Sequence, residues 1–153
     1  MKIALLSFVA EPPHDPLGEM VQQRLTRSSD DQIVREVLRP DLGRLKGLLL
    51  AALTDPRFDG IVVLADLPGM GNEALVTQVE ASLQQYLPAW QPLVAQLLWP
   101  HIGSNALWSH GCLGRSHRRL LAALTGHSAA VESVLDGLLV PQLDRLLDWS
   151  ARG

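Results

Sequence analysis

Short apolar runs rich in β-branched residues alternate along this chain with longer segments in which leucine recurs every three or four positions. The short runs are typical of strands that are buried on both faces, and the longer segments are typical of helices. Because strands that alternate with helices form parallel sheets covered on both sides, the order of elements predicts an α/β fold with a mostly parallel sheet. The predicted strands are Lys2–Val9, Gln32–Leu38, Ile61–Ala65 at the centre of the sheet, and Leu120–Leu124.

Helical segments are expected between and after these strands. Pro141 interrupts the last of them and is expected to kink that helix or split it in two. The stretch from His101 to Gly114 contains three glycines and has no clear assignment. The predicted helices run from Gly18 to about Arg27, from Pro40-Asp41 to about Leu53, over Asn72–Leu83, between Pro92 and Trp99, and from about Ala129 to Asp148.

The composition indicates one compact domain that spans residues 1–153. Hydrophobic residues make up 47% of the chain and charged residues 19%, which favours a packed core over disorder. The net charge of −3 provides no basic field for nucleic acid or anionic lipid, and we interpret the short run from Arg115 to Arg119 as a solvated turn.

The cellular setting follows from the cysteine count and the longest apolar runs. Cys112 is the single cysteine, which excludes an internal disulfide framework and fits a reducing, cytoplasmic compartment. Apolar runs such as Leu48 to Leu53 are far shorter than the roughly 20 residues that span a bilayer, so we expect no membrane partner. The apolar start of the chain is interpreted as the first strand rather than as a secretory leader.

The turn that follows the central strand resembles a phosphate-binding loop that has been altered. It reads Asp-Leu-Pro-Gly-Met-Gly-Asn from Asp66 to Asn72, between a strand and a helix, where backbone N–H groups can converge on an anion. Leu67 adds bulk there, and Pro68 removes one donor. Asp66 would repel a phosphate unless Mg²⁺ lay between them, and the alternative is that Asp66 caps the turn.

Two further segments are expected at the same edge of the sheet, because ligands of parallel sheets bind outside the carboxyl ends of the strands. They are Asp15–Gly18 and Gly126–Ser128. Asp15 is either a ligand-binding residue or a turn acid, and Ser128 is either a phosphate donor or a helix cap. Asp41, which follows Pro40, is suited to cap a helix or to bind Mg²⁺, and these two roles are compatible.

A set of landmarks in the second half of the chain has a familiar spacing. They are Ile102-Gly103-Ser104, Leu107, Ser109, Gly114, an apolar strand, Gly126 and Pro141-Gln142-Leu143. With Asp15-Pro16-Leu17-Gly18 and Pro40-Asp41 near the start, this pattern resembles the MoaB/Mog family of molybdopterin-binding proteins, which act in molybdenum cofactor biosynthesis. The resemblance implies a three-layer α/β/α domain that assembles as a homotrimer or as a dimer of trimers.

The resemblance implies an activity as well. Members that adenylylate molybdopterin with Mg²⁺ and ATP usually carry Thr-Gly-Gly-Thr-Gly after the central strand and an acidic residue soon after it. This chain has the altered turn, with Leu75 at the position of that acid, and Gly126-His127 and Ser109-His110 also differ from the family pattern. We therefore expect molybdopterin binding with adenylyltransferase activity that is weak or lost. The alternative is a catalytically inactive binding or assembly module that keeps only the fold.

Site residues follow from the resemblance and the strand-end positions together. Asp41 and Asp66 are the expected catalytic and Mg²⁺-binding residues, and Mg²⁺ and ATP are expected only if the protein is active. Other cofactor-biosynthesis proteins are the expected partners besides molybdopterin. The tryptophans are expected in the core or at a subunit interface. The expected ligand-binding residues are Asp15, Gly18, Gly69, Gly71, Ser104, Ser109, Gly126, His127 and Ser128.

Overall fold

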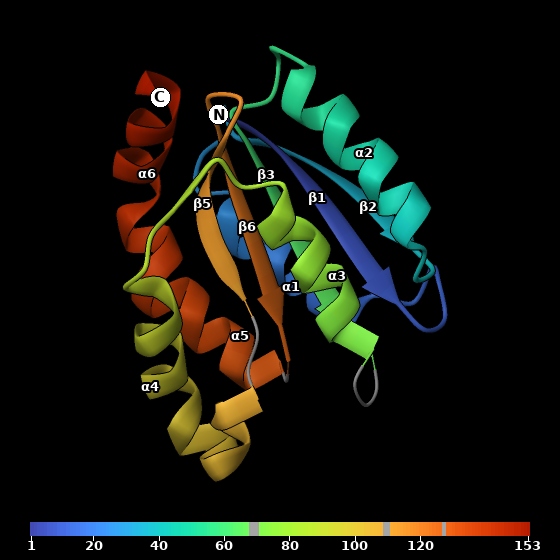
Figure 1. Ribbon diagram of the computed structural model, residues 1–153, viewed down its shortest axis with the longest axis vertical. Coiled ribbons are helices and arrows are strands. Elements are labelled where there is room, and N and C mark those ends of the chain that lie inside the picture. Colours follow the sequence, from blue (N-terminus) through green and yellow to red (C-terminus); the bar gives the residue numbers. More distant parts are fainter. Residues whose placement is uncertain (68–70, 109–110, 127) are drawn as a thin grey trace.

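The computed structural model describes residues 1–67, 71–108, 111–126 and 128–153, and it contains one six-stranded sheet in the order β2-β1-β3-β6-β5-β4 (Figure 1). The four strands predicted from the sequence are present within a residue of their expected ends. The strands are β1 (Lys2–Val9), β2 (Gln32–Leu38), β3 (Gly60–Asp66), β4 (Gln85–Tyr86), β5 (Cys112–Ser116) and β6 (Arg119–Thr125).

The mostly parallel character of the sheet is confirmed. β1 pairs in parallel with β2 and with β3, and β3 pairs in parallel with β6. The segment Ile61–Ala65 therefore lies at the centre of the sheet and is almost wholly buried, as predicted. β5 and β4 add an antiparallel extension beyond β6.

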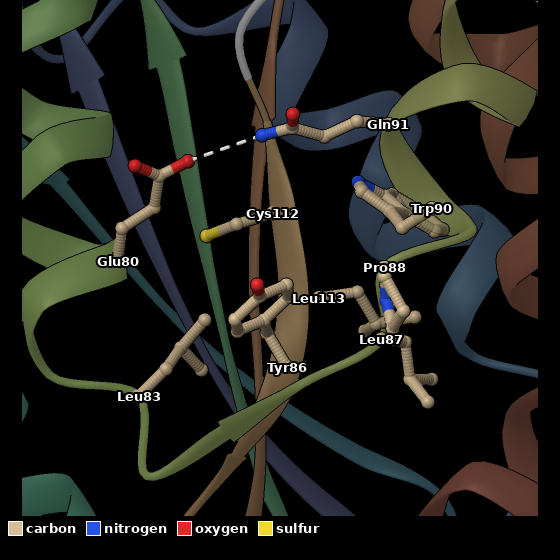
Figure 2. Close-up of a pocket in the computed structure, with 9 residues that line it drawn as sticks. All are labelled: Glu80, Leu83, Tyr86, Leu87, Pro88, Trp90, Gln91, Cys112 and Leu113. Atoms are coloured by element: carbon tan, nitrogen blue, oxygen red, sulfur yellow. Dashed lines mark hydrogen bonds between the residues drawn. The ribbon is translucent and has the colours of Figure 1, made fainter.

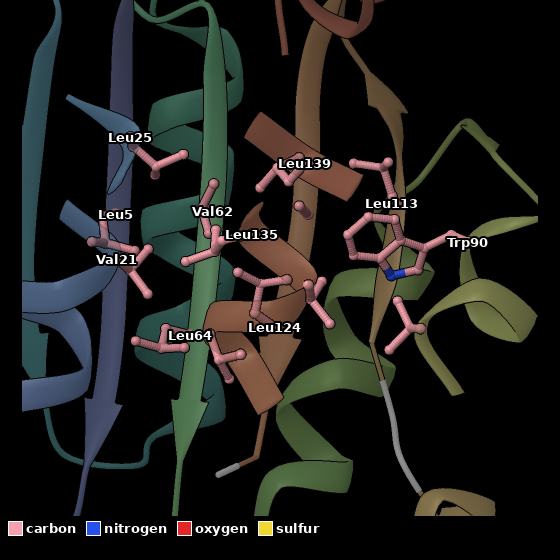
Figure 3. Packing of buried hydrophobic residues seen from close by; sticks show 14 of the residues in the cluster. Leu5, Val21, Leu25, Val62, Leu64, Trp90, Leu113, Leu124, Leu135 and Leu139 are labelled. Atoms are coloured by element: carbon pink, nitrogen blue, oxygen red, sulfur yellow. The ribbon is translucent and has the colours of Figure 1, made fainter. Parts of the chain in front are cut away.

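Helices cover both faces of the sheet, so the fold has the three layers that the resemblance implied (Figure 1). One core contains Leu5, Val62 and the apolar sides of α1, α4, α5, η2 and α6 (Figure 3). The opposite core contains Leu6, Val63 and the apolar sides of α2 and α3. The helices are α1 (Pro16–Leu25), α2 (Leu42–Thr54), α3 (Gly71–Ala81), α4 (Trp90–Ile102), η1 (Gly103–Trp108), α5 (Ser128–Val134), η2 (Leu135–Leu139) and α6 (Val140–Arg152).

Several helices have other ends than predicted, such as α4, which is longer at both ends, and for two helices the reason is identifiable. α1 begins two residues before Gly18, because Asp15 caps it and Pro16 occupies the first turn, where a missing N–H costs nothing. The last helix is divided, as Pro141 suggested, but the break is a π-helical segment, η2, that precedes the proline. Pro141 itself lies in the first turn of α6.

The antiparallel extension was not predicted, because its strands are short and carry few of the residues that identify strands. Gly114 is required in β5, since a Cβ there would lie 2.2 Å from the carbonyl oxygen of Gln85. The run from Arg115 to Arg119 forms the ends of β5 and β6 and the turn between them. Arg115 is not simply solvated, because its guanidinium lies 4.7 Å from the centre of the Trp149 ring and donates to the Trp149 carbonyl.

Within the described part of the chain, no helix combines the length and the apolar character that a membrane crossing requires.

Candidate functional site at the carboxyl ends of the parallel strands

The parallel strands end side by side and place the sequence-predicted segments at one edge of the sheet. Val9 of β1 lies opposite Asp66 of β3, and Ala65 lies opposite Thr125 of β6. The residues that follow these strands, which include Asp15, Gly126 and Ser128, therefore lie at the same edge. η1 is at this end of the molecule too (Figure 1).

Asp15 is fully engaged in a buried network. Its side chain is 2% exposed. One carboxylate oxygen, Oδ1, accepts from the Ser7 hydroxyl and from the Gly18 backbone N–H, both at 2.9 Å. The other, Oδ2, lies 3.0 Å from Nη1 of Arg35 on β2. Asp15 is therefore a buried helix cap with its own counter-charge rather than a plain turn acid.

Gly18, a predicted ligand-binding residue, belongs to this same network. A Cβ at Gly18 would lie 1.9 Å from Oδ2 of Asp15, so only glycine leaves room for the carboxylate to cap the helix. The Gly18 N–H points at Asp15 and is not available to an anion. Gly18 therefore serves the position of Asp15.

Asp66, at the end of β3, lies in a different electrostatic environment. It is partly buried. Burial is the main cause of a pKa above the usual aspartate value, and the negative charge of Asp15 adds to the effect. Both causes disfavour the ionised form of Asp66. Asp66 is thus a carboxylate that would be stabilised by a proton or by a cation.

The turn after Asp66 is closed by Asn72, which the sequence did not single out. Asn72 Oδ1 accepts from the Leu67 N–H at 3.0 Å, and Asn72 Nδ2 donates to the Leu67 carbonyl at 3.3 Å. Leu67 is also packed against the core and lies 3.3 Å from where a Cβ of Gly71 would stand. The Leu67 N–H is therefore already satisfied. The predicted residue Gly69, with Pro68, lies outside the described residues.

Asp41 is exposed and caps α2, with Oδ1 accepting from the Arg44 N–H at 3.0 Å. It follows β2, whereas Asp66 ends β3, and β1 lies between these strands. Two strand spacings correspond to about 10 Å, which is too far for two carboxylates to share one ion directly. Among the described residues, no group of three or more His, Cys, Asp or Glu side chains is placed to hold a metal ion.

The remaining predicted ligand residues that the structure describes lie on η1 and in the turn from β6 to α5. Ser104 is exposed on η1, and Ser128 is exposed as the first residue of α5. Gly126 has a φ of 112°, which favours glycine and marks a sharp turn out of β6. Ser109 and His127 lie outside the described residues.

The histidines do not form a metal or nucleophile site where they are described. His101 Nε2 lies 2.9 Å from the Ser133 hydroxyl, and that hydroxyl donates to the Ala129 carbonyl at 3.1 Å. The hydroxyl proton is therefore committed to a backbone acceptor, so Nε2 of His101 is the donor in this contact. His117 lies in the turn between β5 and β6 and bonds to its neighbour Ser116.

Ser7, Arg35 and Asn72 are the site residues that sequence reasoning missed. From the hydrophobic pattern, Ser7 is assigned only to a buried face of β1 and Arg35 only to a polar face of β2. Their partnership with Asp15 joins three segments, β1, β2 and the cap of α1. The sequence contains no signal for that partnership. The position of Asn72 at the end of a predicted turn is the signal that identifies it, because Asn is common where a side chain closes a turn.

The fold can now be compared with known proteins. No family model matches the sequence, and no curated protein matches it. A solved structure of molybdenum cofactor biosynthesis protein B is similar, with a TM-score of 0.82 and 19% identity over 99% of this chain and 96% of that chain. The chain has the fold of the MoaB/Mog proteins.

Two further structures support this assignment of the fold. The Mog protein from Mycobacterium ulcerans, described as a molybdopterin biosynthesis protein, has a TM-score of 0.79 and 16% identity over 99% of this chain and 98% of that chain. A tungsten cofactor synthesizing protein MoaB from Pyrococcus furiosus has a TM-score of 0.77 and 12% identity over 98% of this chain and 96% of that one. The similarity spans essentially the whole of each chain.

The described residues do not fit Mg²⁺ and ATP well. The Leu67 N–H is bonded to Asn72, and Asp15 is neutralised by Arg35. Leu75, at the position of the family's acid, is buried in the core and offers no ligand atom. Asp41 and Asp66 are separated by a strand. No metal-assisted step can be built from these residues.

Proposed function

We propose that this protein binds molybdopterin at the carboxyl ends of its parallel strands and acts in molybdenum cofactor biosynthesis. The observation that carries the proposal is the correspondence of fold over 99% of this chain with a molybdenum cofactor biosynthesis protein. The sequence landmarks Ser104, Gly126 and Ser128 support it, because they fall at the edge where ligands of parallel sheets bind.

The phosphate of molybdopterin is proposed to lie near the ends of β6 and η1. The hydroxyls of Ser104 and Ser128 are exposed there and provide neutral donors. The sharp turn at Gly126 opens the backbone to a ligand without a side chain in the way. Ser109, His127, Gly69 and Gly71 are proposed as further ligand-binding residues on the basis of the sequence pattern.

Adenylyl transfer is proposed to be weak or lost in this chain. Transfer needs donors and a cation where charge develops on the phosphates. Here the first donor of the turn is bonded to Asn72, and the nearest buried carboxylate, Asp15, is paired with Arg35. If Mg²⁺ and ATP do bind, the proposed ligand of the ion is Asp41 or Asp66, and not both at once, because a strand lies between them.

The protein is further proposed to act in the cytoplasm as a homotrimer, with other cofactor-biosynthesis proteins as partners. Exposed apolar side chains on α4 and η1 support an assembly. Trp99 is 62% exposed and Leu107 is 81% exposed, and such groups are stabilised when a neighbour covers them. Light scattering tests this: a mass near three times 16.7 kDa is expected, and a mass near 16.7 kDa would reject the trimer.

The test of the ligand is calorimetric titration of the full chain with molybdopterin and, separately, with Mg·ATP. We expect binding of molybdopterin and weak or undetectable binding of Mg·ATP. Changing Ser128 to Ala should weaken molybdopterin binding about tenfold, since one hydrogen bond to a charged phosphate is lost. The control is Ser82→Ala, which follows the last residue of α3, away from the carboxyl ends of the parallel strands. Binding of neither ligand would favour an assembly module that keeps only the fold.

A further inference from the structure

An apolar groove of about 370 Å³ lies between α4 and α6, over β5. Its size falls within the range of sites for small organic ligands, roughly 300–1,000 Å³. None of the residues assigned above to the strand-end site lines it, and neither Trp99 nor Leu107 does. The apolar walls are formed by Leu87, Leu93, Leu113, Leu138, Leu146 and Trp149.

The walls come from segments that are far apart in the sequence. Leu93 belongs to α4, Leu113 to β5 and Leu138 to the π-helical segment η2. Single π-helical turns are rare and occur frequently at functional sites. Leu93 is 42% exposed, so part of this apolar surface faces water. A ligand with an apolar body would be stabilised by covering it.

A second cavity, of about 490 Å³, adjoins the groove on the side of α3, and Figure 2 shows its lining. Leu87, Trp90 and Leu113 line both spaces. Trp90 Nε1 is buried and has no hydrogen-bond partner in the described part of the chain, so it offers no donor to a ligand. Glu80 lines only the second cavity, where Oε1 accepts from Gln91 Nε2 at 3.3 Å (Figure 2). The described lining of the groove therefore contains no acid.

Arg145 is the charged residue of the groove. Its side chain is exposed and makes no hydrogen bond or ion pair within the described residues. The nearest acids of α6 have other partners: Asp144 lies 2.8 Å from Nη2 of Arg27, and Asp148 pairs with Arg152. The Arg145 guanidinium is therefore free to bind a carboxylate, which its paired N–H groups match in geometry.

The other polar groups beside the groove are positive or neutral. The Arg115 guanidinium lies 4.7 Å from the centre of the Trp149 ring and donates to the Trp149 carbonyl at 2.9 Å. Arg115 thus fixes this wall and adds a second positive charge near it. Gln142, which also lines the groove, is exposed and uncharged. The groove therefore complements a molecule with an apolar tail and an anionic head.

We propose that this groove binds a straight-chain carboxylate of medium length, with its tail between the leucines of α4 and α6 and its head group paired with Arg145. The limited volume favours a single chain over a two-chain lipid. The inference does not depend on the proposed function, because the groove shares no residue with the strand-end site and the ligand has neither a ring nor a phosphate.

The test is a titration of the full chain with octanoate, followed by two-dimensional NMR of the tryptophan indole groups. Trp149 lines the groove, so we expect its indole resonance to shift. The resonance of Trp99, which is exposed on α4 outside the groove, should not move. The two resonances are assigned from their loss in Trp149→Phe and Trp99→Phe. A Trp149 resonance that stays in place at millimolar octanoate would overturn the proposal.

Two further probes and one variant test the role of the charge. 1-Octanol and octylammonium have the same chain, and each should bind at least about fivefold more weakly than octanoate. Arg145→Gln should weaken octanoate binding about fivefold and leave 1-octanol binding unchanged, because only the charge is lost. The matched control is Arg44→Gln, an exposed arginine on α2, which covers the other face of the sheet. Equal octanoate binding by Arg145→Gln and the wild type would contradict the assignment.

Ala89→Trp tests whether the ligand lies in the groove. Ala89 immediately precedes α4, is exposed and lines the groove, so a large side chain there fills the groove without entering the core. Octanoate binding should be lost while the circular dichroism spectrum is retained, and unchanged binding would reject the site. If a second copy of the chain covers the groove instead, octanoate will not bind and Ala89→Trp will have a smaller mass in light scattering, which would also overturn the proposal. Molybdopterin titration can fail or succeed independently.

Discussion

Asp15 and Asp66 occupy neighbouring positions at the same edge of the sheet, and their surroundings are opposite. Asp15, which follows β1, has a hydroxyl, a backbone N–H and the Arg35 guanidinium within 3.0 Å. Asp66, at the end of the adjacent β3, has a pKa raised by burial and by the charge of Asp15. The fold stabilises the ionised form of Asp15 by hydrogen bonds and an ion pair, and it destabilises the ionised form of Asp66.

An acid at the end of a strand is therefore not by itself a functional acid. The partners of Asp15 satisfy both of its oxygens, so its role is to join β1, β2 and α1. Asp66 is stabilised when its charge is removed or countered, which is the behaviour expected of a ligand-binding or regulatory group. Three variants test whether the two acids differ in this way.

The largest effect is expected for Asp15→Ala. The change removes the cap of α1 and leaves both the buried Ser7 hydroxyl and the Arg35 guanidinium without their acceptor. We therefore expect the free energy of unfolding to fall by about 3 kcal/mol. Urea denaturation of the purified variant measures it. The matched control is Asp41→Ala, which removes an exposed cap alone and should cost about 1 kcal/mol. Equal costs for the two variants would show that the buried network adds nothing to the cap.

A smaller effect is expected for Asn72→Ala. The variant loses the two hydrogen bonds that close the turn at Leu67, and we expect a loss of about 1–2 kcal/mol in urea denaturation. Freed of Asn72, the Leu67 N–H becomes available, so Mg·ATP binding in calorimetry should strengthen rather than weaken. Asn105→Ala on η1, an exposed asparagine, serves as the control and should change neither quantity. A variant as stable as the wild type would show that the hydrogen bonds of Asn72 do not stabilise this turn.

The smallest effect is expected for Asp66→Asn, and it should be stabilising. A native-state pKa above the ordinary 3.8 means that the folded protein binds this proton more tightly than the unfolded chain does. The contribution of Asp66 to stability is therefore lost as pH rises through the raised pKa. The asparagine variant should be more stable than the wild type at about pH 7, and the gain should shrink as pH falls toward about 4. A loss of stability at neutral pH would mean that the ionised form has a favourable partner.

Much of the fold could be predicted because its buried strands are strong local signals. Lys2–Val9 and Gln32–Leu38 have the predicted ends, and Ile61–Ala65 lies at the centre as expected. The predicted start of α1, Gly18, is two residues too late, because the cap Asp15 and Pro16 precede the periodic part of the helix. β4 and β5 were missed, since two-residue strands and a glycine-bearing strand are stabilised by pairing with neighbours rather than by their own sequence.

The candidate site was predictable only in outline. Alternation of strands and helices was enough to place Asp15, Asp66 and Ser128 at one edge. No local sequence pattern predicts the π-helical segment before Pro141 or the cation–π contact of Arg115. The cavity beside Trp90 joins residues from α3, β4, α4 and β5, which no single segment of sequence brings together.

The sequence alone determined the α/β class, the parallel centre of the sheet and the edge where its loops meet, because burial and helical periodicity are written locally along the chain. Which acid at that edge has a counter-charge depends on contacts between distant segments. Charge compensation acts through space, and Ser7, Asp15 and Arg35 become neighbours only when β1, β2 and α1 are packed together. For the same reason, the unsatisfied indole N–H of Trp90 is a property of the folded chain, since it depends on which acceptors the other segments bring near it.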